Sequence, residues 1–301
     1  MKKRRKLRCI CAVLCFAIVV PVVWLFIYTN HSEEGDRKFK PSVTVVSPSL
    51  SKQWQPTKRR VPAPGKRCLI SFAESRSRPF IALASFPGSG NTWVRHLLEV
   101  ATGIYTSSPY NDSVLYKAGF LGEGTNHRDG KTLVAKTHDF FPSQTDFSAA
   151  IVLIRNPYHA FIADYNRMAA GHIGFADVHM FRQKGWENYV TFAALAWQKF
   201  YINWLGWKNN KIIIYYEDLV NNTLLQVRNI MTFLSLTLEE DRQICLLGNV
   251  EGKFHRHGKR FDSRNETLFS DVMTEVVNQS IENVNVFLKE KGWKTVYYKT
   301  P

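Results

Sequence analysis

Hydrophobic and polar positions divide the chain into three parts. Residues 9–28 are apolar throughout and carry no charge, and a helix of this length, at about 1.5 Å per residue, spans a bilayer core. Residues 29–78 hold few periodic apolar positions and several prolines, which is typical of an extended stem. From residue 79 onward, short apolar runs alternate with amphipathic segments. This pattern predicts one folded domain over 79–301.

Within that domain the pattern alternates between strands and helices. Apolar runs predict strands at FIALASF (80–86), LVAKTH (133–138), AAIVLIR (149–155) and KIIIYYE (211–217). Helical spacing predicts helices at 93–101, 158–170, 187–207 and 224–234. Nearly continuous apolar strands separated by helices favour an α/β fold with a parallel sheet flanked by helices. Four aromatic residues at helical spacing are interpreted as core rather than as a ligand cage: Trp197, Phe200, Tyr201 and Trp204.

The charge around the apolar run predicts how the chain is oriented. Residues 1–8 carry six positive charges and no acid, so the positive-inside rule makes them a cytoplasmic tail. Residues 9–28 then form a transmembrane signal anchor of type II, and the domain lies in the lumen of the Golgi. A cleaved signal peptide is the alternative. The apolar run is longer than the hydrophobic region of such a peptide, and small residues do not follow it.

The positive charge of the chain belongs to the tail and stem. Residues 1–80 contain 17 basic and 4 acidic residues, whereas the remainder contains 23 basic and 21 acidic residues. The domain therefore lacks the basic surface that is typical of nucleic-acid binders, and no nucleic-acid partner is expected.

Glycosylation sequons and cysteines agree with a lumenal domain. The acceptor triplet N-x-S/T occurs after the anchor and not before it, at Asn30, Asn111, Asn221, Asn265 and Asn278. Three cysteines lie in the anchor segment, which leaves Cys68 and Cys245 for the lumen. Because the lumen is oxidising, a disulfide between these two is expected.

The stretch SFPGSGNTW, residues 85–93, directly follows an apolar strand. Its glycines allow a sharp turn, Ser89, Asn91 and Thr92 offer side-chain donors, and the next helix begins with free N–H groups. These features predict a phosphate site. The lysine of the pattern G-x-x-x-x-G-K-[ST] is missing, which disfavours metal-bound triphosphate chemistry, and simple turn punctuation is the alternative.

Five segments in order resemble the motifs of the sulfotransferases: FPGSGNTW, AKTHDF, IRNPYHAF, YYEDL and FHRHG. The resemblance covers about residues 80–292 and implies the nucleotide-kinase-like P-loop fold of that family. It also implies 3′-phosphoadenylyl sulfate as co-substrate and no metal.

Position by position, the resemblance implies a role for each motif residue. Ser89, Gly90, Asn91 and Thr92 would hold the 5′-phosphate, and Arg155 with Arg256 the 3′-phosphate. Trp93 and Tyr216 would contact the adenine, while Phe254 and Gly258 belong to the element that closes over the adenosine. His138 would act as the base that takes the proton of the acceptor.

Longer stretches resemble one branch of that family. ASFPGSGNTWVRHLLE, IRNPYHAFIADYNR and AGHIGFA are similar to the sulfotransferase domain of the WSC-domain-containing proteins, whose vertebrate members sulfate sialic acid. This implies a glycan or glycoprotein acceptor, with sialic acid as one candidate. The chain has neither room nor cysteines for WSC modules.

Two departures from the family pattern concern the chemistry. The usual loop lysine is Gly88 here, and a serine expected on the helix after the R-N-P segment is Ala163. A cation stabilises the negative charge that develops on the leaving oxygen, so another residue must supply it. Lys136, two residues before His138 and on the same face of the strand, is the first candidate, and Arg95 and Lys259 are next. The alternative is a catalytically inactive receptor for a glycan or nucleotide.

Overall fold

The computed structural model describes residues 68–252, 254 and 268–300. No helix in this part of the chain combines the length and the apolarity that a membrane span requires. The predicted tail, the anchor and most of the stem lie outside the described residues, and so do Asn30, Arg256, Gly258, Lys259 and Asn265.

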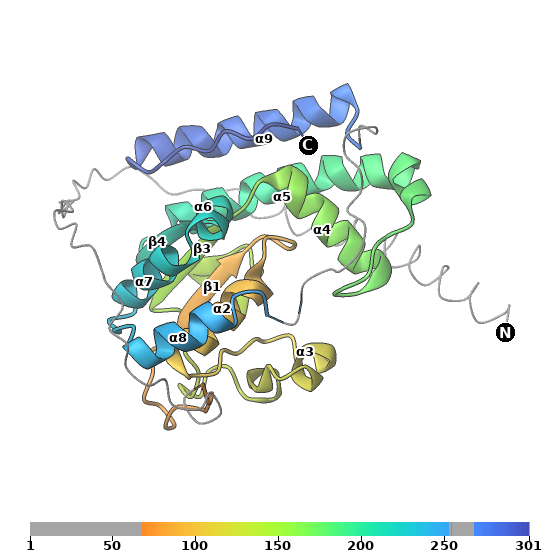
Figure 1. The fold of residues 1–301 in the computed structure, drawn as a ribbon. Helices are drawn as coiled ribbons and strands as arrows, with labels where there is room; N and C mark the ends of the chain where they lie inside the picture. The colour runs from red at the N-terminus through yellow and green to blue at the C-terminus, as the bar shows by residue number, and fades with distance from the viewer. Residues whose placement is uncertain (1–67, 253, 255–267, 301) are drawn as a thin grey trace, which may run out of the picture. The chain divides into compact units, whose positions relative to one another are not determined.

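Among the described residues, four strands form one parallel sheet (Figure 1). The strands are β1 (Ile81–Ser85), β2 (Ala135–Thr137), β3 (Ala149–Ile154) and β4 (Asn210–Tyr215), in the order β2-β1-β3-β4. After β1 the chain forms β2 on one side of β1 and then β3 on the opposite side of β1. Such a change of direction opens a crevice at the carboxyl end of β1, where ligands of open parallel sheets bind.

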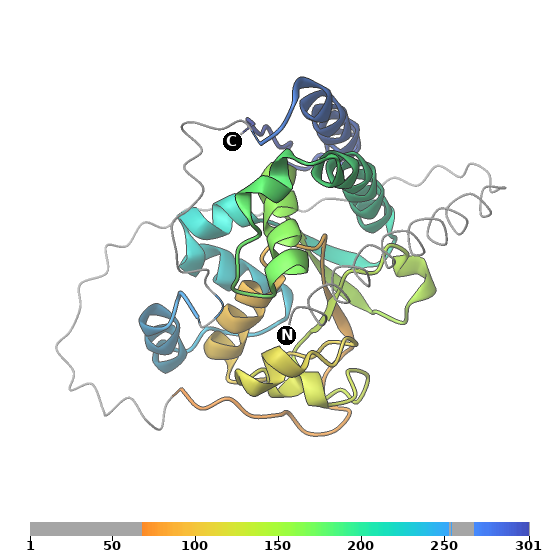
Figure 2. The ribbon, with the colours of Figure 1, turned by 90° about the vertical axis from the view of Figure 1, so that its right-hand side faces the viewer.

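Helices cover both faces of the sheet. Successive side chains of β1 and β3 point to opposite faces, and on each face they pack in a separate hydrophobic core. Leu83 and Leu153 face one core, together with α2 (Asn91–Thr102), α7 (Thr223–Phe233) and α8 (Glu240–Gly248). Ala84 and Val152 face the other, with α4 (Pro157–Ala170), α5 (Lys184–Gly206) and α9 (Asp271–Glu290). Figure 2 shows α9 lying along α5. Shorter elements are α3 (Ser113–Lys117), α6 (Tyr216–Asn221) and the 3-10 turns η1 (Leu121–Gly124), η2 (Pro142–Gln144) and η3 (Val178–Arg182).

The structure confirms the predicted α/β class, with a parallel sheet flanked by helices. All four predicted strands are present, and the four predicted helices are α2, α4, α5 and α7, with ends shifted by no more than three residues. Strand ends differ most at two places: Tyr216 and Glu217 begin α6 and do not extend β4, and Leu133 and Val134 precede β2. The sequence pattern did not predict α3, α8 or α9.

The aromatic residues of α5 are core, as predicted. Trp197, Phe200, Tyr201 and Trp204 are fully buried, since α5 lies between the sheet and α9. A buried aromatic side chain removes roughly 150–250 Å² from water, so this row contributes much of the apolar burial on its face of the sheet.

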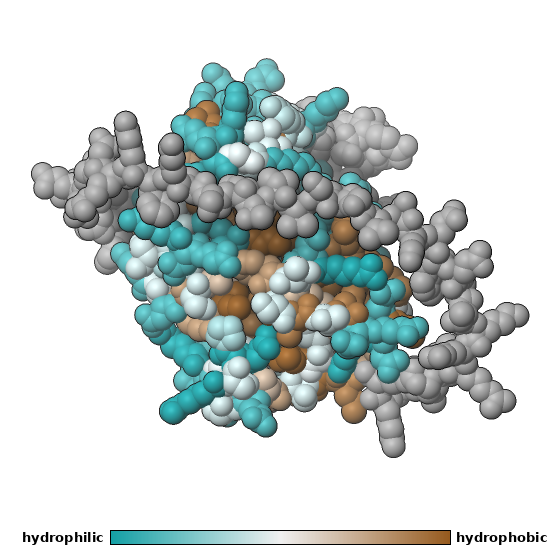
Figure 3. Space-filling view, turned by 90° about the vertical axis from the view of Figure 1, so that its left-hand side faces the viewer, coloured by the Kyte–Doolittle hydropathy of each residue, from teal (hydrophilic) through white to brown (hydrophobic). Residues whose placement is uncertain are grey.

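Some apolar side chains remain at the surface. On the face shown in Figure 3, hydrophobic residues gather in the middle and hydrophilic residues surround them. The exposed apolar side chains of the described residues include Tyr110, Ile173, Phe175 and Leu247. Scattered exposure of this kind is normal in folded proteins. Of these four, Tyr110 contacts the candidate site.

Candidate active site

The loop between β1 and α2 runs from Phe86 to Gly90 and is too tightly packed for added side-chain atoms. Gly88 and Gly90 have φ angles of 75° and 91°, a left-handed conformation that favours glycine. A Cβ atom at Gly88 would lie 2.1 Å from the main-chain oxygen of Ala160 in α4, and one at Gly90 would lie 2.5 Å from Cε2 of Tyr216. A lysine at position 88 therefore cannot fit unless α4, which also carries Ala163, moves away.

Ser89 and Asn91 lie beneath the loop, and their side chains are already engaged. The Asn91 amide donates to the Leu83 carbonyl (2.9 Å) and to the Ser85 hydroxyl (3.1 Å), so its side chain points back to β1. The prediction that this side chain offers a donor to a ligand was wrong. Ser89 is buried, with its hydroxyl 3.5 Å from that of Tyr201.

The main-chain N–H groups at the start of α2 remain available. The helix has Gly90 as its N-cap, and no side chain among the described residues caps it. The first N–H groups of a helix lack partners within the helix and form the positive end of its dipole. The loop therefore offers main-chain donors to an anion, at the carboxyl end of β1.

Arg155 follows β3 and reaches the same loop. Its Nη1 donates to the Gly88 carbonyl (2.7 Å), and its guanidinium carbon lies 4.2 Å from the centre of the Tyr216 ring. Its Nε is buried and has no hydrogen-bond partner among the described residues. A buried donor without a partner is costly, and a guanidinium in this position beside the loop is suited to an anion.

The aromatic residues assigned to the adenine lie near the start of α2. The rings of Trp93 and Tyr216 are 5.6 Å apart in an edge-to-face arrangement, and Nε1 of Trp93 donates to the Val250 carbonyl (2.8 Å). Phe254 packs against Phe120 and His172. One small pocket is lined by Thr92, Trp93, His96, Phe120, Glu251, Gly252 and Phe254. Trp93 and Phe254 are therefore brought together, whereas Arg256 and Gly258 lie outside the described residues.

His138 directly follows β2 and touches the last residue of β1. Its Nδ1 lies 2.6 Å from the Ser85 carbonyl. Because a carbonyl only accepts, Nδ1 carries the proton, and in the neutral ring Nε2 is then the acceptor. Burial, and next the Lys136 cation, lower the pKa of His138 to about 3. The imidazole is therefore neutral above about pH 5, and Nε2 makes no hydrogen bond to any described residue.

Lys136 lies on the same face of the sheet as His138, as predicted, and its charge acts on the imidazole. Burial, and next the charge of Arg95, lower the pKa of Lys136 to about 8. The amine is therefore mostly protonated below that pH. Its Nζ lies 5.4 Å from the centre of the Tyr110 ring and has no ion-pair partner among the described residues.

Arg95 is not available as the replacement cation, which corrects its place among the candidates. The side chain is fully buried and paired with Glu123, and its Nε donates to the Thr106 hydroxyl (2.7 Å). A buried and paired guanidinium serves the fold. Lys259 lies outside the described residues, so Lys136 is the candidate that the structure places beside His138.

Tyr110 is a site residue that the sequence analysis missed. Its hydroxyl accepts the main-chain N–H of His138 (2.7 Å), and the two rings stack 5.6 Å apart. Tyr110 belongs to an irregular segment without periodicity or a motif. The only signal near it is a run of turn-forming residues, which does not predict a function.

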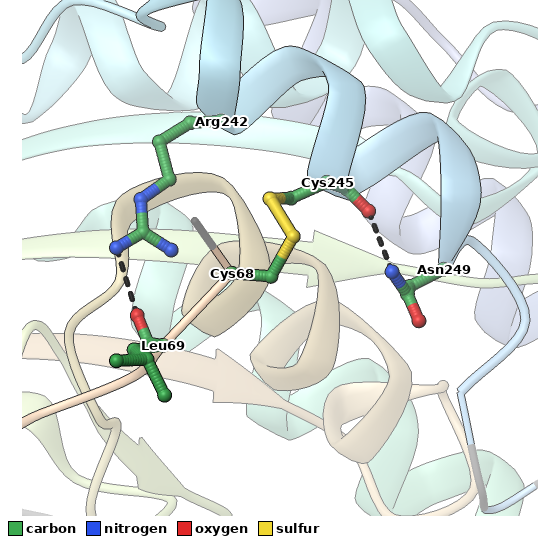
Figure 4. The surroundings of a disulfide bond; sticks show 5 residues. All are labelled: Cys68, Leu69, Arg242, Cys245 and Asn249. Atoms are coloured by element: carbon green, nitrogen blue, oxygen red, sulfur yellow. Dashed lines mark hydrogen bonds between the residues drawn. A yellow bond between two sulfur atoms is a disulfide. The ribbon is translucent and has the colours of Figure 1, made fainter. Parts of the chain in front are cut away.

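The two cysteines named from the sequence are joined in the structure, which confirms that prediction. Cys68 and Cys245 form a disulfide with their Cα atoms 5.6 Å apart (Figure 4). Arg242, one turn before Cys245 on α8, donates to the Leu69 carbonyl (2.8 Å). The disulfide and this hydrogen bond hold residues 68 and 69 against α8.

The sequons that the structure describes differ in their surroundings. Asn111 and Asn221 are exposed. Asn278 lies within α9, where its side-chain oxygen accepts from the Tyr158 hydroxyl (2.9 Å), and Ser280 of the same triplet is buried. Use of each sequon stays a prediction. So does the expectation of metal-free chemistry, although the described residues contain no cluster of three metal-binding side chains.

Comparison with known proteins gives relatives by sequence. No family model matches the chain. It is 38% identical over 210 residues to the WSCD family member CG9164 of Drosophila melanogaster, and the match covers 67% of this chain and 66% of that protein. A WSCD family member of Drosophila pseudoobscura, GA21586, is 37% identical with the same coverage. The chain thus matches just under two thirds of the length of these curated relatives.

Solved structures with similar folds are more distant. The mouse sulfotransferase SULT7A1 complexed with PAP has a TM-score of 0.49 and 18% identity, covering 73% of this chain and 90% of that one. A sulfotransferase from Alicyclobacillus acidocaldarius has a TM-score of 0.41 and 11% identity, covering 71% of this chain and 96% of that one. With TM-scores below 0.5, these structures have only a distant similarity of fold to this chain.

Proposed function

The chain belongs to the WSCD family, and from this premise we propose that it transfers a sulfuryl group from 3′-phosphoadenylyl sulfate to a hydroxyl group of a glycan. One observation carries the proposal. His138 Nδ1 lies 2.6 Å from the carbonyl of Ser85, the residue that immediately precedes the loop Phe86–Gly90. This contact supports the proposal because it places a neutral imidazole at the carboxyl end of β1, next to the loop that we assign to the donor phosphate.

The described residues fit the donor nucleotide. The left-handed glycines leave positions 88 and 90 of the loop without side chains, and the start of α2 offers uncapped N–H groups. Arg155 has a buried Nε without a hydrogen-bond partner among the described residues. Each of these features suits a phosphate. When bound, the donor would supply an activated sulfuryl group.

The residues around His138 support proton transfer from an acceptor hydroxyl. As the acceptor oxygen forms its bond to sulfur, the bond between sulfur and the 5′-phosphate oxygen of the donor would break, and adenosine 3′,5′-bisphosphate would leave with that electron pair. The O–H bond of the acceptor would break at the same time, and its proton would move to Nε2 of His138. The Ser85 carbonyl holds the imidazole in the tautomer that leaves Nε2 as acceptor. Lys136 adds a positive charge that stabilises negative charge developing during the transfer. An anion beside Lys136 would offset its charge and so strengthen His138 as a base.

The acceptor and the cellular location are part of the same proposal. A glycan or glycoprotein acceptor, with sialic acid as one candidate, is supported by the resemblance of three sequence stretches to the WSC-domain-containing sulfotransferases. A single-pass Golgi protein with its domain in the lumen is supported by the one-sided charge around residues 9–28 and by the sequons behind them.

A receptor without activity is a second candidate. It is favoured by the packing at Gly88, which leaves no space for a loop lysine. Such a protein would bind the nucleotide or the glycan and transfer nothing.

Transfer of a radiolabelled sulfuryl group to a glycan mixture tests the proposal when it is combined with calorimetric binding of adenosine 3′,5′-bisphosphate. We expect turnover in the wild type, and a loss of about 10²- to 10⁴-fold in His138→Ala with nucleotide affinity retained. His179→Ala, which changes an exposed histidine, serves as the control. Nucleotide binding without turnover against every acceptor class would favour the receptor, and full turnover in His138→Ala would refute the role of the base.

A further inference from the structure

One side chain outside the sequence motifs, that of Tyr110, makes three contacts with the two residues assigned to the transfer. Its hydroxyl accepts the main-chain N–H of His138 at 2.7 Å, its ring stacks on the imidazole at 5.6 Å, and Lys136 Nζ lies 5.4 Å from the ring centre. We propose that Tyr110 is a positioning residue that holds His138 and Lys136 in place for the acceptor. This inference rests on the proposed function.

The hydroxyl of Tyr110 replaces a main-chain acceptor that the sheet does not provide. Alongside β2, the N–H of Lys136 donates to the Ser107 carbonyl (2.8 Å), and Ser107 bridges to Ala135. The next N–H on the same side of the strand is that of His138. The segment leaves the strand after Ser107, so the Tyr110 side chain accepts this N–H instead. A main-chain N–H at the end of a three-residue strand would otherwise lose its partner.

The Tyr110 ring covers the imidazole and also lies beneath the lysine. Burial is the largest cause of the low pKa of His138, and the positive charges of Lys136 on β2, Arg167 on α4 and Arg95 on α2 act in the same direction. An aromatic face also favours a cation placed over it. The ring thus separates the imidazole from water on one side and keeps the lysine beside it.

A buried polar network fixes the segment that carries Tyr110. Glu123, which is paired with Arg95, accepts from the Ser108 hydroxyl (2.7 Å) and from the Asp112 N–H (3.1 Å). The Ser108 hydroxyl in turn accepts the N–H of Tyr110 (3.1 Å). Arg95 lies on α2, so this network links the helix that starts at the loop to Tyr110.

Two substitutions separate the two contributions of this side chain. Tyr110→Phe keeps the ring and removes the acceptor for His138, and we expect kcat to fall by about tenfold, with the KM for the donor nucleotide within about twofold. Tyr110→Ala also uncovers the imidazole, so the pKa of His138 should rise toward about 6.5. Because the base acts only when neutral, turnover of Tyr110→Ala should fall as the pH drops below about 6.5, whereas the wild type should show no such fall above about pH 5.

The control is Tyr116→Ala, since Tyr116 lies on α3 and is 46% exposed, close to the 47% of Tyr110. The full chain is labelled with ¹⁵N-histidine, and the His138 signals are identified by their loss in His138→Gln. We expect protonation of His138 near pH 6 in Tyr110→Ala, but not in the wild type or in Tyr116→Ala.

The spectroscopic measurement needs no turnover, so the two proposals can fail separately. If the ¹⁵N spectrum changes as expected but neither the wild type nor any variant is active, the positioning role of Tyr110 is supported and the proposed sulfotransferase activity is rejected. Turnover in the wild type, with Tyr110→Phe and Tyr110→Ala both indistinguishable from Tyr116→Ala in kcat, pH profile and ¹⁵N spectrum, would overturn the role of Tyr110.

Discussion

The two halves of the candidate site are held together by different forces. The loop half consists of Phe86–Gly90, the start of α2, Arg155 and Tyr216, and it relies on close packing around two glycines. The histidine half consists of residues 106–124 with Lys136 and His138, and it relies on a buried ion pair and a chain of hydrogen bonds. Added side-chain atoms should therefore destabilise the loop half, and loss of polar atoms should destabilise the histidine half.

The largest effect on stability is expected in the histidine half, from Glu123→Gln. This change leaves the buried Arg95 guanidinium without its counter-charge, which typically costs about 3 to 5 kcal/mol. The free energy of unfolding, measured by chemical denaturation, should fall by this amount.

The matched control is Asp146→Asn, because Asp146 pairs with Arg128 at the surface, where the side chains are 75% and 53% exposed. Removing that pair should change the free energy of unfolding by about 0 to 1 kcal/mol. Equal losses in the two variants would mean that the buried network does not hold the histidine half.

The loop half is tested by Gly88→Ala. The added methyl group meets the Ala160 carbonyl and also requires a left-handed backbone, so we expect a loss of about 2 to 5 kcal/mol in the free energy of unfolding and weaker nucleotide binding. Gly292→Ala has a similar φ, 70°, and open space around it, so it should cost only about 1 to 2 kcal/mol. If both variants lose the same amount, the contact with α4 contributes nothing.

The same contrast explains how much the sequence could predict. The loop half is local: one strand, one turn and one helix start are contiguous, so Gly88, Ser89 and Gly90 could be assigned from a motif. Asn91 is the first residue of α2, and its side-chain amide points to β1 rather than to a ligand. This direction could not be predicted, because a sequence does not say which way an amide points. The strands were found because each lies in a short apolar run that is followed by turn or helix-start residues.

The histidine half is assembled from residues far apart in the chain. Arg95 meets Glu123 across 28 positions, and His138 donates to Tyr110 across the same number. No spacing rule links such pairs, so Tyr110 was missed and Arg95 was taken for a free cation. Residues 256 and 258 lie outside the described part of the chain, and their assigned roles remain predictions.

Lys136→Ala removes a cation of the histidine half that has no ion-pair partner among the described residues, and it should affect the rate more than nucleotide binding. If Lys136 replaces the missing loop lysine, kcat should fall by about 10²-fold, with the affinity for adenosine 3′,5′-bisphosphate within a few-fold. Lys117→Ala, which removes an exposed lysine on α3, is the control for net charge. A large loss of nucleotide affinity in Lys136→Ala alone would place this lysine with the loop half as a binding residue.

The smallest effect on stability is expected from Ser113→Ala. This variant tests whether the surface of the histidine half is accessible to glycosylation. Ser113 completes the sequon of Asn111, one residue after Tyr110, and both Asn111 and Ser113 are exposed. Replacing Ser113 leaves Asn111 in its left-handed conformation (φ 49°), which asparagine tolerates. If the domain is lumenal, the variant should run faster on a gel by one endoglycosidase-sensitive glycan, with its free energy of unfolding changed by no more than about 0.5 kcal/mol.

Ser280→Ala is the control within α9, where the Asn278 amide and the Ser280 hydroxyl are both hydrogen-bonded. Its mobility should match that of the wild type. Wild-type mobility for Ser113→Ala would show that Asn111 carries no glycan, even though its side chain is exposed.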